Sequence, residues 1–125
     1  MDRMELVKAL RADTEVHYNC CQSVLIPFCD CCGIDRETAR RLGAHFGSGM
    51  RYGGACGALT GALMVLGMAG KDQAAAEAVL DHFRTCRAST DCQILLQKAE
   101  EEGIPRKTHC DALVYEIVAL VERLL

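Results

Sequence analysis

An uncharged stretch of eighteen residues, GGACGALTGALMVLGMAG at positions 53–70, most constrains how this chain can fold. Its length is close to the minimum for a helix that crosses a membrane. However, its six glycines and one threonine lower its hydrophobicity, and the segments on both sides are amphipathic and charged. The sequence therefore predicts that this stretch forms a buried central helix and that the protein does not interact with a membrane.

Apolar residues recur at helical spacing along nearly all of the chain, while the alternation typical of β-strands is hard to find. We therefore expect an all-α fold, a compact bundle of about six or seven helices around the glycine-rich helix, with residues 1–125 forming a single cysteine-rich domain. The signals that mark where these helices begin or end are Asn19, Gly33, Asp35, Asp91, and Thr108 with Asp111.

The composition excludes several classes of protein. The net charge is -3, aromatic residues make up 5% of the chain, and the lysines and arginines are scattered, which argues against a nucleic-acid-binding surface. The first segment, MDRMELVKALRADTEVHY, is charged and amphipathic, unlike a signal peptide. Because the number of cysteines, nine, is also odd, we expect the reducing cytoplasm rather than a secreted disulfide scaffold.

Four of the nine cysteines fall in the first turn of a predicted helix: Cys20, Cys56, Cys92 and Cys110. A helix N-terminus presents unpaired N–H groups and the positive end of the helix dipole, so it stabilises a thiolate and lowers the pKa of the thiol. The thiolate is the form that binds metals and attacks disulfides. These positions therefore predict a metal or redox site.

The remaining cysteines carry weaker signals, and each of the nine has the alternative interpretation of a small core residue. The Cys29–Cys32 pair has Cys-x-x-Cys spacing but closes a helix and follows no strand, so it is a weak thioredoxin-like motif, and an auxiliary metal or cluster ligand is an open alternative. His109, beside Cys110, is the histidine that we expect nearest to a site. The five additional cysteines are Cys21, Cys29, Cys31, Cys32 and Cys86.

The segments around the four cysteines read YNCCQSVL at 18–25, GGACGALTGALMVLG at 53–67, FRTCRASTDCQILL at 83–96 and CDALV at 110–114. They resemble the redox-active protein family named for its C_GCAxxG_C_C pattern, and the most specific element is CGAxxGA, which begins at Cys56. The resemblance implies four characteristic cysteines, association with oxidoreductases or transporters, and a likeness to a domain of iron-sulfur-containing cytochromes. The four cysteines map to Cys20, Cys56, Cys92 and Cys110.

Sulfur-only ligation at helix N-termini makes an iron-sulfur cluster held by these four cysteines our leading hypothesis. Such a protein would act in electron transfer or as a redox accessory protein, rather than as a stand-alone enzyme, with an oxidoreductase as its redox partner. The alternatives are a thiol-disulfide oxidoreductase or redox sensor that uses two of the cysteines, and a structural zinc site with four cysteine ligands. The apolar, glycine-rich surfaces would also suit a homodimer.

Overall fold

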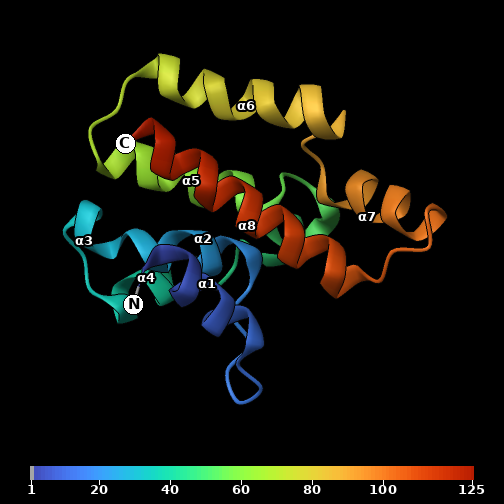
Figure 1. The fold of residues 1–125 in the computed structure, drawn as a ribbon, viewed down its shortest axis with the longest axis horizontal. Helices are drawn as coiled ribbons and strands as arrows, with labels where there is room; N and C mark the ends of the chain where they lie inside the picture. Colours follow the sequence, from blue (N-terminus) through green and yellow to red (C-terminus); the bar gives the residue numbers. More distant parts are fainter. Residues whose placement is uncertain (1) are drawn as a thin grey trace.

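The uncharged stretch forms helix α5 (Gly57–Met68), which lies in the middle of the protein (Figure 1). The computed structural model describes residues 2–125, which contain eight α-helices, two short helical turns and no strand. The all-α fold is thus confirmed. The other elements are α1 (Arg3–Ala12), α2 (Cys20–Leu25), η1 (Ile26–Phe28), α3 (Cys29–Cys32), α4 (Arg36–Leu42), η2 (Gly49–Gly53), α6 (Gln73–Arg87), α7 (Cys92–Glu101) and α8 (Arg106–Leu124).

Helix α5 is buried because α2 packs directly on its glycines. A Cβ atom added to Gly57 would lie 3.1 Å from the Cβ of Cys20, and one added to Gly61 would lie 2.8 Å from the carbonyl oxygen of Cys21. The backbones of the two helices therefore approach more closely than alanine would allow. The starts of α2 and α5, where two of the predicted site cysteines lie, are held side by side.

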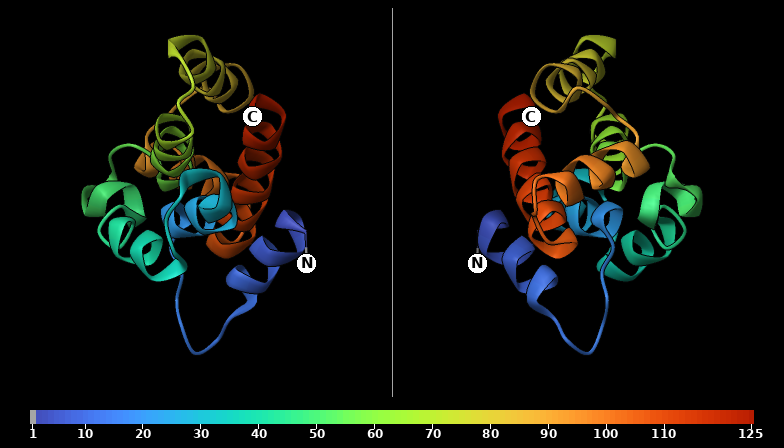
Figure 2. Two further views of the ribbon diagram at one scale, coloured as in Figure 1. Left: turned by 90° about the vertical axis from the view of Figure 1, so that its left-hand side faces the viewer. Right: turned by 90° about the vertical axis from the view of Figure 1, so that its right-hand side faces the viewer.

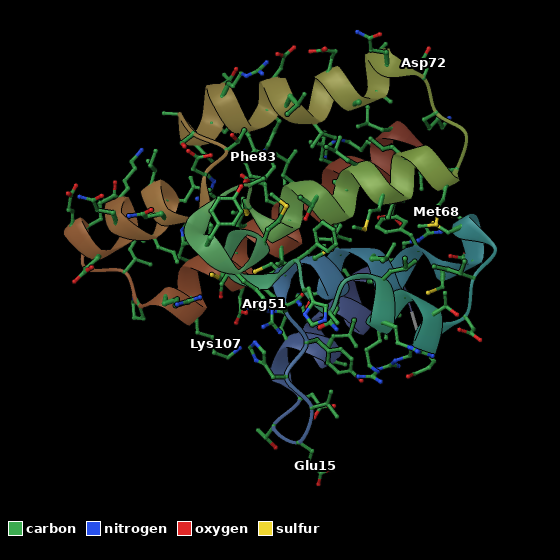
Figure 3. The ribbon with its side chains drawn as sticks, turned by 180° about the vertical axis from the view of Figure 1, so that it is seen from behind. Glu15, Arg51, Met68, Asp72, Phe83 and Lys107 are labelled. Atoms are coloured by element: carbon green, nitrogen blue, oxygen red, sulfur yellow. The ribbon has the colours of Figure 1, made fainter. Side chains whose placement is uncertain are left out.

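The other helices enclose this pair. Helix α8 packs against α1, α2, α5, α6 and α7, and α6 lies over α5 and α8 at one edge of the molecule (Figure 2). The loop between α1 and α2 projects from the body, with Glu15 at its tip (Figure 3). No helix among residues 2–125 combines the length and the apolar character needed to cross a membrane.

Most of the predicted helix boundaries are confirmed. The side chains of Asn19 and Asp35 accept the N–H groups of Gln22 and Thr38 at the starts of α2 and α4, and Gly33 ends α3 with a left-handed φ of 68°. The number of helices exceeds the predicted six or seven because η1, with its proline, separates α3 from α2.

The start of the last helix was predicted wrongly. Thr108 and Asp111 form no capping box; α8 begins at Arg106, after Pro105 as the N-cap residue. Proline cannot donate a backbone hydrogen bond, and its fixed φ suits the beginning of a helix. The helix therefore begins at the residue directly after the proline.

The segment before α5 has an unusual backbone. Ser48, Gly49, Met50 and Arg51 all have φ between 53° and 69°, so they form one left-handed turn. Left-handed conformation costs roughly 1–2 kcal/mol for each residue that is not glycine. Gly49 is also closely surrounded, since an added Cβ would lie 2.7 Å from the Cβ of Cys92.

The close approach of α2 and α5 can be tested with two glycines of the same helix. Gly61→Ala should destabilise the protein by about 1–3 kcal/mol, because the new methyl group meets the backbone of Cys21. Gly67→Ala has nothing within 4 Å of its Cβ and should instead stabilise the helix by roughly 0.5–1 kcal/mol. Denaturant unfolding of both variants measures the difference; equal effects would contradict the close contact of α2 and α5.

Candidate functional site

The four predicted site cysteines come together around one small cavity. Helices α2, α7 and α8 contribute Cys20, Cys92 and Cys110, and Cys56 immediately precedes α5. The cavity has a volume of about 30 Å³, and its wall also includes Ser48 of the left-handed turn and the buried ring of His109. We call it the inner cavity. His109 thus borders the site, as its neighbour Cys110 suggested.

Cys56 and Cys92 are held together by a short backbone bridge. Ala55 and Asp91 form an isolated antiparallel pair. On either side of it, the N–H of Cys56 donates to the carbonyl of Thr90 at 2.8 Å, and the N–H of Cys92 donates to the carbonyl of Gly54 at 2.7 Å. These bonds fix two residues that are 36 positions apart in the sequence.

The prediction that all four cysteines occupy the first turn of a helix holds for three of them. Cys20 and Cys92 are the first residues of α2 and α7, and Cys56 is the N-cap residue of α5. Cys110 is the exception, because α8 begins at Arg106 and places it beyond the first turn. The unpaired N–H groups of that helix start therefore do not explain the properties of Cys110.

Burial overrides the helix N-terminus at Cys56. Burial disfavours the charged form and raises the pKa of Cys56 to about 11, although the backbone N–H groups of Ala58 and Leu59 at the start of α5 act in the opposite direction. The expectation of a lowered thiol pKa is therefore wrong for Cys56. Burial also raises the pKa of Cys92.

Cys20 and Cys110 form an unequal pair. Hydrogen bonding between the two thiols raises the pKa of Cys20 well above its ordinary value and lowers that of Cys110 to about 7. Burial and Asp111 oppose the shift at Cys110, while the cations Arg11 and Arg106 reinforce it. Of the two sulfurs, Cys110 is thus the one that carries negative charge near neutral pH.

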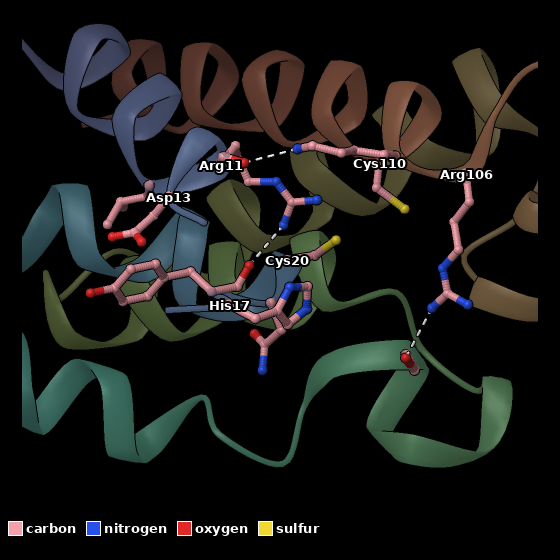
Figure 4. Close-up of a pocket in the computed structure, with 11 residues that line it drawn as sticks. Arg11, Asp13, His17, Cys20, Arg106 and Cys110 are labelled. Carbon is pink, nitrogen blue, oxygen red and sulfur yellow. Dashed lines mark hydrogen bonds between the residues drawn. The ribbon is translucent and has the colours of Figure 1, made fainter. Parts of the chain in front are cut away.

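Cys20 and Cys110 also face a larger space, which Cys56 and Cys92 do not reach. This outer pocket has a volume of about 370 Å³ and lies between the end of α1, the α1–α2 loop, the left-handed turn and the start of α8. Both sulfurs point into it (Figure 4). Its other lining residues include Arg11, Asn19 and Arg106.

Arg11 is fixed in place behind the pair. Its side chain is 8% exposed and donates to Asp111 at 2.7 Å. It also donates to the carbonyl of Tyr18 at 2.9 Å (Figure 4). Arg11 and Arg106 could not be recognised from the sequence, because an arginine at the end of an amphipathic helix and one in an apparent linker have no distinctive pattern. Proximity of Arg106 to Cys110 in the sequence was the one available signal.

The four cysteines suit a metal site by type but not by spacing. Thiolates are the ligands that iron-sulfur clusters and structural zinc prefer. Within residues 2–125, however, no three His, Cys, Asp or Glu side chains are close enough to hold a metal ion as they stand. The inner cavity has room for little more than a water molecule, which needs about 10–15 Å³, so a cluster would require the thiols to move apart.

The additional cysteines lie away from this site. Cys29 and Cys32 are on the short helix α3 at the opposite end of α2, and Cys31 accepts a hydrogen bond from Arg3 at 3.0 Å. Cys86 is exposed near the end of α6, and Cys21 is fully buried, where the loss of solvation raises its pKa to about 11. None of the five lines the inner cavity or the outer pocket in the described part of the chain.

Residues 18–124 match the model of the family described as "Putative redox-active protein (C_GCAxxG_C_C)". The chain belongs to this family. The match includes all four cysteines of the inner cavity, and it confirms the family that their surrounding segments indicated. No curated protein and no solved structure matches the chain. The C_GCAxxG_C_C family is redox-active by its description, which agrees with a site built from thiols.

The unequal ionisation of the thiols predicts which one reacts first with an alkylating reagent. Only the thiolate reacts, so the rate of alkylation of Cys110 should rise with pH and reach half of its maximum near pH 7, while Cys21 and Cys56 should reach half of theirs only near pH 11. Short pulses of iodoacetamide at a series of pH values, followed by peptide mass spectrometry, measure this order. Labelling of Cys56 before Cys110 near neutral pH would contradict it.

Proposed function

We propose that this protein is a thiol-disulfide redox protein in which Cys20 and Cys110 form the reacting pair. The observation that carries the proposal is the placement of these two cysteines, which line the inner cavity together and both face the outer pocket. A dithiol needs two cysteines in mutual reach and one of them open to a substrate. The membership in a redox-active family supports the same chemistry.

The unequal pair assigns a role to each thiol. Cys110, with its lowered pKa, supplies the thiolate that attacks a substrate disulfide and forms a mixed disulfide, and the departing sulfur takes up a proton. Cys20 then loses its proton and attacks the sulfur of Cys110, so that the second product leaves as a thiol. One substrate disulfide is reduced to two thiols, while the two protein thiols are oxidised to a disulfide.

Cys56 and Cys92 lie behind this pair and contact only the inner cavity among the described pockets. Their raised pKa values keep them as neutral thiols at neutral pH, so they do not compete with Cys110 for a substrate. A redox partner protein, which we expect to be an oxidoreductase, would restore the reduced pair.

The proposed disulfide can be detected directly. Reduced protein equilibrated with mixtures of oxidised and reduced dithiothreitol should lose two alkylatable thiols reversibly, and peptide mapping should identify them as Cys20 and Cys110. Cys20→Ser or Cys110→Ser should abolish this transition.

Cys86→Ser removes an exposed thiol outside the site and should leave the transition unchanged, which makes it the matched control. A transition that maps to Cys29 and Cys32, or one that survives in Cys110→Ser, would refute the assigned pair.

Iron-sulfur binding is the second candidate, because four thiols from four parts of the chain line one cavity. Cys20, Cys56, Cys92 and Cys110 would hold the cluster, which would supply one-electron transfer. Anaerobic reconstitution should then give a brown protein with comparable amounts of iron and sulfide. Cys56→Ser should lose this iron and Cys86→Ser should not; a colourless, iron-free protein would rule the cluster out, and stoichiometric zinc would favour a structural site.

A further inference from the structure

The outer pocket carries more positive than negative charge. One carboxylate lines it among residues 2–125, that of Asp13, and this group accepts the backbone N–H groups of Glu15 at 2.8 Å and Val16 at 2.9 Å. Asp13 therefore shapes the α1–α2 loop and forms no ion pair with the cations of the pocket wall. The cations that line the pocket are Arg11, Arg106 and Lys107.

Asp111 compensates only part of this charge. It pairs with Arg11 at 2.7 Å and with Lys107 at 2.9 Å, so two cations share one carboxylate. Arg106 has no carboxylate partner in the described part of the chain; it donates to the neutral hydroxyl of Ser48 at 3.0 Å (Figure 4). The Ser48 contact holds the guanidinium at the pocket wall, where its charge acts on Cys110 and is shared with no carboxylate of the described residues.

Arg106 places its positive charge close to the reacting thiols. It lies one helical turn before Cys110 on α8, and both residues line the inner cavity and the outer pocket. An arginine side chain presents several N–H donors in a planar arrangement that suits a carboxylate. A negatively charged group bound at Arg106 would place the adjoining part of the same molecule beside the sulfur of Cys110.

Resting on the function proposed above, we propose that the outer pocket binds a small disulfide that carries carboxylate groups, and that Arg106 recognises its charge. A volume of about 370 Å³ falls in the usual range for small-molecule sites. The bound disulfide is cleaved in the exchange already described: Cys110 attacks one sulfur, the other leaves and is protonated, and Cys20 releases the remaining half as a second thiol.

Three disulfides of similar length and different charge test this proposal on the reduced protein. They are 3,3'-dithiodipropionate, a dianion; 2-hydroxyethyl disulfide, which is neutral; and cystamine, a dication. Each rate of thiol release is divided by the rate of the same disulfide with a small free thiol, which removes differences in intrinsic reactivity. The normalised rates should decrease from the dianion to the neutral compound to the dication, and added salt should reduce the differences.

The variant Arg106→Gln should lower the ratio of the dianion rate to the neutral rate by about fivefold, the amount expected for one partly exposed ion pair. This ratio cancels any change that the variant causes in the reactivity of Cys110 itself. Arg84→Gln, on the exposed face of α6, should leave it unchanged.

An equal response to the three disulfides, or a ratio that Arg106→Gln does not lower, would overturn the assigned substrate class while the reacting pair stands. Failure of the wild-type protein to react with any of the three would overturn the reacting pair and the substrate class together.

Discussion

The close contact of α2 and α5 is the constraint on which the site depends. Gly57 and Gly61 allow the backbone of α2 to lie so close to α5 that a Cβ atom at either position would force neighbouring atoms to shift. This contact brings Cys20 beside the start of α5, where Cys56 lies. From there the backbone bridge extends to Cys92, and α8 closes the cavity with Cys110. An apolar helix weakened by glycine is thus what permits four distant cysteines to meet.

Burial and charge then divide the four thiols into two kinds. Cys56 is at a helix N-terminus, where nearby backbone N–H groups favour the thiolate, yet its pKa is raised because the loss of solvation outweighs their effect. Cys110 lacks such a position but has a thiol donor and two guanidinium groups nearby, and its pKa is lowered. The pKa of a thiol in this site therefore depends on nearby charges and on a hydrogen-bond donor more than on its position in a helix.

The sequence was sufficient to predict the helical fold, the buried central helix and the four cysteines that meet at one cavity, because these rest on periodicity, capping residues and a specific motif. It was insufficient for the start of α8, where Pro105 took precedence over a capping pattern at Thr108. Arg11 and Arg106 were also missed, since their roles depend on which helices meet, and no local pattern records this. The difference between Cys56 and Cys110 has the same origin, because burial is a property of the assembled fold.

The left-handed turn at residues 48–51 is stable only within the folded protein. Three of its four residues, Ser48, Met50 and Arg51, have side chains that oppose this conformation, at a combined cost of roughly 3–6 kcal/mol. That is comparable to the net stability of a whole small domain, commonly about 5–15 kcal/mol. The turn can therefore persist only while the packing around it is intact. D-amino acids would adopt the same backbone without this cost. The L-residues of this segment of the cavity wall therefore adopt an unfavourable conformation, which the contacts of the surrounding fold maintain.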